Sequence, residues 1–254
     1  QLFGDRAGRW ADGADGTHGD LLDLIMANRN LDFRAACDEA RAFLRLPIVP
    51  ARRSEAPAPP GTSDAARRLF AASGSIRGTL AEAYLCQRGI ALPSDISALR
   101  FHPRCFYRAP SGRQEWPALI AAVTDGKGNV TGVHRTWLDP SGGKAPVDQP
   151  RRALGHLAGN GVRFGTVTDT MLAAEGLETA LALKMIMPAM PVIAALSAAH
   201  LAALNLPSTL RQLYVARDND QAGRIALKKL RSRAVDLDIR ELVPRAEDFN
   251  ADLL

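Results

Sequence analysis

The sequence predicts an α/β protein: a parallel sheet flanked by helices in the carboxyl-terminal part, preceded by a small α+β subdomain and a helical amino-terminal region. From Thr166 onward, short apolar runs of strand type alternate with helical segments, which is the pattern of parallel βαβ units. The turn sequence from Thr124 to Asn129 lies between two apolar runs and predicts a β-hairpin. Apolar residues at helical spacing follow Asp20 and predict a helix there.

Caps and glycines define the expected helices before the hairpin. Asp20 can cap the first helix, and a second helix is expected over 33–44. Residues 63–88 are expected to be helical, with a break near the middle. Within them, the phrase from Thr79 to Glu82 has the form of a capping box. Gly89 suits the left-handed conformation that ends a helix.

The carboxyl-terminal elements can be assigned one by one. Strands are expected over 171–174, 192–196, 213–216 and 239–243, and helices over 177–187, 198–204, 222–235 and from about Asn250. The Gly- and Arg-bearing stretch 141–161 has no regular pattern, so no element is predicted in it. Four parts are therefore expected: a helical segment (1–46), a Pro-rich linker (47–62), a helical and β subdomain (63–165) and the α/β domain (166–254).

The composition is that of a soluble globular protein, with 46% hydrophobic and 23% charged residues among 254. A net charge of +5 is compatible with nucleic-acid or nucleotide partners. The three cysteines form no Cys-x-x-Cys pair, so neither a disulfide framework nor a zinc site is indicated. No apolar run approaches membrane length, and we expect a cytoplasmic protein with no membrane partner.

Three acidic residues follow two of the predicted strands. Glu175 comes directly after the first strand, and Asp218 and Asp220 come directly after the third. Because sites in open parallel sheets form at the carboxyl ends of strands, we expect these carboxylates to lie close together. Their mutual repulsion is relieved if a divalent cation, Mg²⁺ or Mn²⁺, neutralises them, as in nucleotidyl transfer. The alternative is that they are ordinary loop and helix-capping acids.

Residues beside these acids fit the same interpretation. Gly176 lets the backbone pass close to a ligand. Gly223 opens the helix after Asp220, so that free backbone N–H groups point toward the same edge. Arg217 lies beside the aspartates and can meet a phosphate.

Three phrases in this part resemble the signatures of the Toprim domain. They are Glu-Gly-Leu-Glu-Thr-Ala-Leu-Ala from Glu175, Asp-Asn-Asp-Gln-Ala-Gly from Asp218, and Asp-Phe-Asn-Ala-Asp-Leu-Leu from Asp248. The resemblance covers about 166–254, and Glu247 stands where a lysine is often found. It implies that Glu175 is a metal ligand or general acid/base and that Asp218 and Asp220 bind Mg²⁺. Glu178, one helical turn on, is expected to be a solvated helix residue rather than a support for the site, while Asp248 or Asp252 completes the site or caps the last helix.

The preceding segment resembles the small β subdomain that comes before Toprim in DNA primases of the plasmid and phage type. The resemblance rests on the apolar run from Trp116 to Val123 and on the phrase from Gly132 to Arg135. It implies nucleotide or nucleic-acid contacts for Arg135 and Lys144. Arg151 and Arg152 are further candidates, because arginines suit phosphates; the alternative for each is a solvated surface charge.

The amino terminus resembles the end of a primase zinc ribbon. Gly8-Arg9-Trp10 and the phrase from Gly19 to Ile25 carry this resemblance. No cysteine occurs there, and Asp12, Asp15 and His18 stand where ligands would be, which makes a poor zinc site. The resemblance therefore implies a degenerate or truncated ribbon without zinc.

These observations favour a DNA primase that joins ribo- or deoxyribonucleoside triphosphates into short primers on a single-stranded DNA template. A Toprim nuclease is the first alternative, and a non-catalytic nucleic-acid-binding accessory of replication or mobilisation is the second. A topoisomerase is disfavoured, because Tyr84, Tyr107 and Tyr214 lack the context of a nucleophile. The sequence contains no helicase P-loop, so we expect any unwinding to come from a separate replicative helicase or from a segment outside this sequence.

Overall fold

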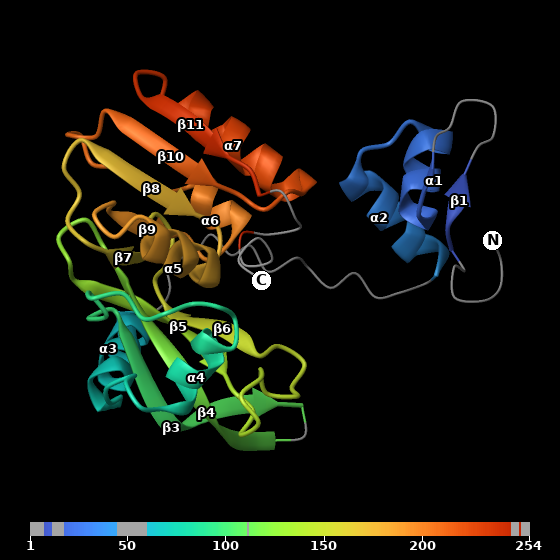
Figure 1. Cartoon of the computed structure of the whole chain (residues 1–254). Coiled ribbons are helices and arrows are strands. Elements are labelled where there is room, and N and C mark those ends of the chain that lie inside the picture. The colour runs from blue at the N-terminus through green and yellow to red at the C-terminus, as the bar shows by residue number, and fades with distance from the viewer. Residues whose placement is uncertain (1–7, 12–17, 45–59, 111, 245–248, 250–254) are drawn as a thin grey trace. The chain divides into compact units, whose positions relative to one another are not determined.

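The computed structural model describes residues 8–11, 18–44, 60–110, 112–244 and 249 (Figure 1). The chain forms two compact units, 1–56 and 57–254. Several predictions lie outside the described residues: the positions of Asp12 and Asp15, the linker up to residue 59, and the last helix near Asn250. No helix in the described part is long and apolar enough to span a bilayer.

The first unit pairs a small antiparallel ribbon with two helices. Its elements are β1 (Trp10–Ala11), β2 (His18–Gly19), α1 (Leu21–Arg29) and α2 (Phe33–Phe43). Asp20 caps α1 as predicted: its side chain accepts from the backbone of Leu22 and Asp23, and the Asp23 carboxylate accepts from the Asp20 N–H at 2.9 Å. Both predicted helices are confirmed in this unit.

The second unit begins with two helices and a four-stranded antiparallel sheet. The helices are α3 (Pro60–Ala72) and α4 (Leu80–Cys86), and the strands, in spatial order, are β3 (Leu99–Ala109), β4 (Gly112–Thr124), β5 (Val130–Trp137) and β6 (Arg151–Gly155). The predicted hairpin is confirmed as β4 and β5. Strand β6 was not predicted, because its two arginines and its glycine hide the strand pattern; pairing with β5, from Gly132 to Thr136, makes it a strand.

The predicted capping box at the start of α4 is wrong. The Thr79 hydroxyl donates to the Ile76 carbonyl at 2.5 Å instead of accepting from the helix. The Glu82 carboxylate accepts from the N–H of Gly78 at 2.5 Å, not from that of Thr79. Gly78 has φ +71°, and this left-handed turn presents its own N–H to the glutamate.

The rest of the unit is a five-stranded sheet in the order β11-β10-β8-β9-β7. The strands are β7 (Val162–Phe164), β8 (Thr170–Ala174), β9 (Val192–Ala194), β10 (Gln212–Ala216) and β11 (Asp238–Leu242), and the helices are α5 (Leu177–Ile186), α6 (Ala198–Ala202) and α7 (Gln221–Arg233). The predicted alternation of strands and helices is confirmed, and four strands are parallel. The sheet is mixed rather than wholly parallel, because β7 pairs antiparallel with β9 at the edge.

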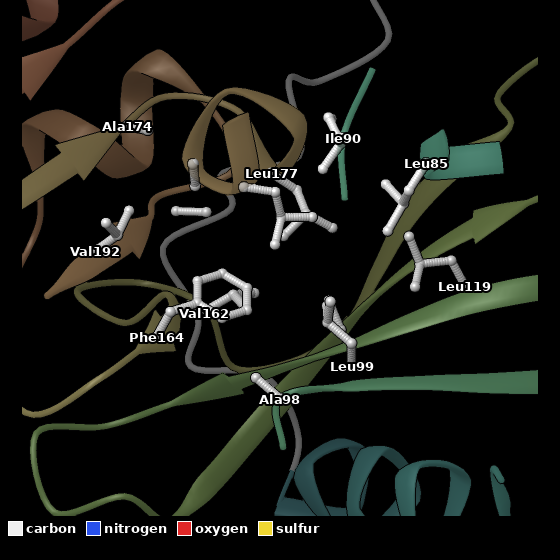
Figure 2. Packing of buried hydrophobic residues seen from close by; sticks show 14 of the residues in the cluster. Leu85, Ile90, Ala98, Leu99, Leu119, Val162, Phe164, Ala174, Leu177 and Val192 are labelled. Atoms are coloured by element: carbon white, nitrogen blue, oxygen red, sulfur yellow. The ribbon is translucent and has the colours of Figure 1, made fainter. Parts of the chain in front are cut away.

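One apolar core joins the two sheets. Leu99 and Leu119 of the four-stranded sheet, Leu85 of α4, Phe164 of β7 and Leu177 of α5 belong to the same buried cluster (Figure 2). A second cluster packs α6 and α7 against the other face of the five-stranded sheet, and a third packs α3 against the other face of the four-stranded sheet. The two sheets therefore share one interior in which the position of each fixes the other.

The shared core predicts that both sheets unfold together. Phe164 is fully buried between them, so Phe164→Ala should lower the free energy of unfolding by about 3–5 kcal/mol. Chemical denaturation followed by circular dichroism and by tryptophan fluorescence should give coincident transitions for 57–254. The matched control Val235→Ala, at a side chain that is 79% exposed, should change stability little. Two separate transitions for the two sheets would contradict the shared core.

Candidate active site

The structure brings the three predicted acids to one edge of the five-stranded sheet. Strands β8 and β10 are parallel neighbours, with Ala174 opposite Ala216. Because the strands end at the same level, their following loops start side by side, and the Glu175 N–H donates to the Ala216 carbonyl at 3.0 Å. Glu175 therefore lies at the end of β8, beside the loop after β10 that carries Asp218 and Asp220.

The environment of Glu175 disfavours its charge. Burial raises the pKa of its carboxyl above the usual value, and the charges of Asp218 and Asp220 raise it further. Backbone N–H groups of Asp218 and Ala198 act in the opposite direction. The Oε2 atom is buried and has no hydrogen-bond partner, which is costly for a carboxylate oxygen. A cation or a transferable proton at this oxygen would relieve that cost.

The loop after β10 is held by its own hydrogen bonds. Asp220 is the N-cap of α7, and its carboxylate accepts from the Gly223 N–H at 2.7 Å. A Cβ at Gly223 would lie 2.7 Å from the Asp218 carbonyl oxygen, so only glycine allows the helix to approach the loop this closely. The close approach fixes the backbone that carries both aspartates.

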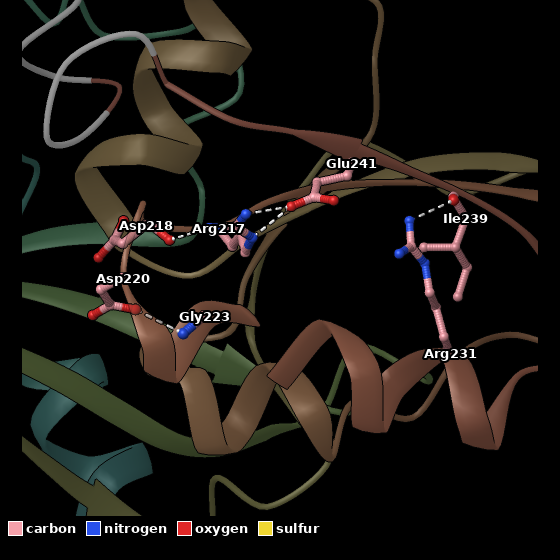
Figure 3. A network of polar contacts seen from close by, with 7 residues as sticks. All are labelled: Arg217, Asp218, Asp220, Gly223, Arg231, Ile239 and Glu241. Atoms are coloured by element: carbon pink, nitrogen blue, oxygen red, sulfur yellow. Dashed lines mark hydrogen bonds and ion pairs between the residues drawn. The ribbon is translucent and has the colours of Figure 1, made fainter. Parts of the chain in front are cut away.

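Arg217 is engaged in contacts within the protein at the start of this loop. Its guanidinium is 7% exposed, makes an ion pair with Glu241 at 2.5 Å and donates to the Asp218 carbonyl at 2.9 Å. Figure 3 shows it directed toward Glu241, with the carboxylates of Asp218 and Asp220 on the other side of the loop. These contacts stabilise the loop, and the phosphate contact suggested by the sequence stays a prediction.

The acidic edge fits a divalent cation in its donor set. Glu175, Asp218 and Asp220 have the hard oxygen ligands that Mg²⁺ prefers, and the Oε2 of Glu175 is buried without a hydrogen-bond partner. Among the described residues, no three His, Cys, Asp or Glu side chains are grouped closely enough to hold a metal ion. Binding of one ion by all three acids would therefore require rotation of these side chains toward a common point, and for Asp220 that rotation would exchange its hydrogen bond from the Gly223 N–H for a contact with the ion.

Beside the acidic edge lies a cleft of about 260 Å³, lined by residues from both halves of the second unit. One side of it is lined by Gly176 and Glu178 at the start of α5 and by Ser197, the N-cap of α6, and the other side by His134 of β5 and Arg151 of β6. Leu196, with the unusual φ of +77°, also lines the cleft where β9 leads into α6. The cleft thus sets an arginine of β6 opposite the loop that begins at Glu175.

Glu178 is a central residue of this cleft, and the expectation that it is solvated is wrong. Its side chain is 10% exposed, it accepts from the Tyr84 hydroxyl at 2.8 Å, and it forms an ion pair with Arg151. Burial opposes its charge, but Arg151 and Tyr84 hold the pKa of its carboxyl below the usual value. Burial and the charge of Glu178 raise the pKa of Tyr84 to about 12. The spacing from Glu175 could not show that α4 and β6 cover this face of α5.

The remaining predicted arginines divide between the two faces of the four-stranded sheet. Arg151 faces the cleft, whereas Arg135 and Arg152 are cross-strand partners whose guanidinium groups lie on the opposite face, although Arg152 also borders the cleft. The Arg135 guanidinium lies 4.8 Å from the Trp137 ring centroid and donates to the Ala153 carbonyl. Lys144 is half-buried, and its backbone pairs with that of Leu138 in an isolated antiparallel β-bridge. The structure therefore does not bring Arg135 and Arg152 to the acidic edge.

Comparison with known proteins identifies two segments of the chain. Residues 170–254 match the Toprim domain family, and residues 60–164 match a domain of unknown function, DUF7146. No curated protein matches the chain.

Three solved structures show similarity at low sequence identity. The Aquifex aeolicus primase, with its zinc-binding and RNA polymerase domains, has a TM-score of 0.48 at 15% identity over 96% of this chain and 69% of that one. The primase fragment of the bacteriophage T7 primase-helicase has a TM-score of 0.43 at 17% identity, over 72% of this chain and 71% of that one. A DNA primase domain from Pseudomonas aeruginosa has a TM-score of 0.49 at 15% identity, over 75% of this chain and 73% of that one.

Gly223 gives the first test of the acidic edge. Gly223→Ala should push the Asp218 carbonyl away and weaken binding of Mn²⁺ about tenfold, measured by calorimetry, because the loop can no longer present both aspartates. The matched control Gly126→Ala meets no atom within 4 Å and should bind Mn²⁺ as the wild type does. Unchanged binding by Gly223→Ala would rule out the loop geometry as a requirement.

The cleft also predicts a pH dependence of stability. The Nδ1 atom of His134 is buried without a partner, and burial lowers the pKa of the imidazole from 6.5 to about 4. Between these pH values the imidazole of the unfolded state binds a proton that the buried imidazole of the folded state does not. The free energy of unfolding is therefore highest above pH 6.5 and decreases by up to about 3 kcal/mol as the pH falls toward 4.

Denaturant titrations across this pH range should show the loss in the wild type and a smaller loss in His134→Gln. His156→Gln, which alters an exposed histidine, should keep the wild-type slope. Equal slopes for wild type and His134→Gln would mean that His134 is not buried as a neutral imidazole.

Proposed function

We propose, from the premise that the chain is a Toprim-domain protein over residues 170–254, that it is a DNA primase-type nucleotidyltransferase. It would join nucleoside triphosphates into short primers on single-stranded DNA. One observation carries the proposal: an acidic edge with Glu175, Asp218 and Asp220 borders a cleft whose opposite wall supplies Arg151. Carboxylates beside an arginine are what a reaction between a hydroxyl and a triphosphate needs.

Toprim domains typically bind a divalent metal ion. In this chain Glu175, Asp218 and Asp220 would hold Mg²⁺ or Mn²⁺. When bound, the ion supplies charge stabilisation for the phosphoryl group and its leaving pyrophosphate. Glu175 presents the buried Oε2 without a hydrogen-bond partner, so this carboxylate can ligate the ion or accept the proton of the attacking 3′ hydroxyl.

Arg151 suits the triphosphate side of this reaction. Its side chain is 39% exposed even though its guanidinium forms an ion pair with Glu178. The Tyr84 hydroxyl shares the same Glu178 oxygen, which fixes the carboxylate from a second side. An arginine held this way loses less conformational freedom when it meets a phosphate than a free surface arginine does.

The tyrosines support a primase over a topoisomerase. A topoisomerase needs an accessible nucleophilic hydroxyl, but Tyr84 and Tyr107 are each 1% exposed and both are hydrogen-bonded. The raised pKa of Tyr84, about 12, disfavours the phenolate further. Tyr214 lies in β10 of the sheet interior and packs against the shared core. Covalent attachment to DNA through a tyrosine therefore has no support in this chain.

Primer synthesis tests the proposal. On single-stranded DNA with labelled nucleotides and Mg²⁺ or Mn²⁺, wild type should make short products. Glu175→Gln and Asp218→Asn should reduce the rate of primer synthesis at least about 10²-fold. Each substitution removes a negative charge that the proposed metal site needs for the reaction. The matched control Asp236→Asn removes an exposed carboxylate just beyond α7 and should retain the wild-type rate.

Two results would overturn the primase proposal. Products that persist at the wild-type rate in both carboxylate variants would dissociate synthesis from the acidic edge. Absence of products from folded wild type, together with metal-dependent cleavage of the same labelled DNA, would assign the site to a nuclease.

A further inference from the structure

A second basic site lies at the end of the β3–β4 hairpin, away from the acidic edge. It is a pocket of about 610 Å³, called here the arginine–aromatic pocket. The residues that define it are Phe106, Arg108, Arg113, Arg135, Trp137 and Arg152. Arg135 lies on the sheet face opposite His134, and His134 lines the cleft beside the acidic edge, so the two sites occupy different faces of the same sheet.

Curling of the hairpin creates this pocket. The register of β3 and β4 shifts between His102 and Cys105, which lets the end of β3 bend over the sheet. The Trp137 indole of β5 then donates to the Cys105 carbonyl at 3.1 Å. Arg152 of β6 reaches across to β3, where it donates to the Arg108 carbonyl at 2.9 Å and the Tyr107 hydroxyl at 2.7 Å. Edge strands β3 and β6 are thereby linked around the pocket.

The pocket concentrates positive charge without a counter-charge in its wall. Four arginines line it, and none of the described residues that line it is acidic. Burial lowers the pKa of Arg135, and the neighbouring charge of Arg152 lowers it further. The Nε atoms of both Arg135 and Arg152 are buried without a hydrogen-bond partner. A wall of this kind is stabilised when an anion in the pocket supplies the missing negative charge.

Each of three arginines also lies over an aromatic ring. The guanidinium carbon of Arg152 is 4.3 Å from the Tyr107 ring centroid, that of Arg135 is 4.8 Å from the Trp137 centroid, and that of Arg113 is 3.2 Å from the Phe106 centroid. Tyr107 and Trp137 are buried, but Phe106 is 48% exposed. Stacked arginines are fixed phosphate donors, and the part of the Phe106 ring that Arg113 leaves exposed offers a surface for a base.

We propose that the arginine–aromatic pocket binds single-stranded nucleic acid, with phosphates on Arg113, Arg135 and Arg152 and a base stacked on Phe106. A strand is favoured over a free nucleotide because Arg152 borders both this pocket and the cleft beside the acidic edge. A single run of phosphates can therefore pass from the cleft over edge strand β6 into the pocket. The inference deepens the proposed function and rests on it in assigning the strand as template.

Binding without catalysis tests the pocket separately from the proposed function. Fluorescence anisotropy of a labelled oligo(dT) of about 20 nucleotides is measured with the full chain, in EDTA and without nucleotides. Phe106→Ala and Arg113→Gln should each weaken binding about five- to tenfold. Arg113→Gln should also reduce the slope of log K against log salt by about 0.7. The matched control Arg104→Gln removes a charge from the same strand at an 81% exposed side chain outside the pocket and should change binding less than about twofold.

The outcomes separate the two proposals. Wild-type oligo(dT) affinity in both Phe106→Ala and Arg113→Gln would overturn the pocket as a strand site, whatever the primer assay shows. Loss of binding to labelled ATP in these variants, with oligo(dT) binding intact, would also overturn it in favour of a free nucleotide. Weakened oligo(dT) binding in the pocket variants, with normal binding in Glu175→Gln, would support the pocket even if the chain made no primers.

Discussion

The buried carboxylate of Glu178 is the interaction on which the arrangement of the cleft depends. A charged group this far from solvent is tolerated only when partners replace the lost water, and here Arg151 of β6 and Tyr84 of α4 do so. Those partners belong to the first half of the second unit, whereas Glu178 belongs to α5. The contact therefore connects the two sheets through polar groups at the rim of the apolar core that they share.

The same contact also fixes the position of Arg151. Arg151 cannot turn freely toward solvent without leaving Glu178 as an unpaired buried charge, so its guanidinium stays beside the cleft. On the other wall, the parallel pairing of β8 with β10 holds Glu175 next to the aspartate loop. Negative charge thus gathers at the strand ends and positive charge on β6, with the cleft between them.

Alternation along β5 and β6 distributes the remaining cations. Residues that are adjacent in sequence face opposite sides of a strand, so the Arg151 side chain faces the cleft while the Arg152 guanidinium reaches Tyr107 in the arginine–aromatic pocket. The curled end of β3 places the rings of Phe106 and Tyr107 in the wall of that pocket, together with Trp137 of β5. Two arginines that are neighbours in the sequence therefore contribute to two surfaces, the cleft and the arginine–aromatic pocket, which lie on either side of edge strand β6.

The sequence by itself determined the alternation of strands and helices from Thr166 onward, the hairpin, the cap at Asp20 and the position of Glu175, Asp218 and Asp220 at one edge of the sheet. These follow from local periodicity and from the rule that parallel strands end at a common edge. Tertiary structure alone decided that β6 is a strand, that β7 runs antiparallel, that Glu178 is buried and that Arg135 faces away from the acids. The physical reason is that each of these depends on a partner distant in sequence. Pairing with β5 or β9, and cover by α4 and β6, override what the local residues indicate.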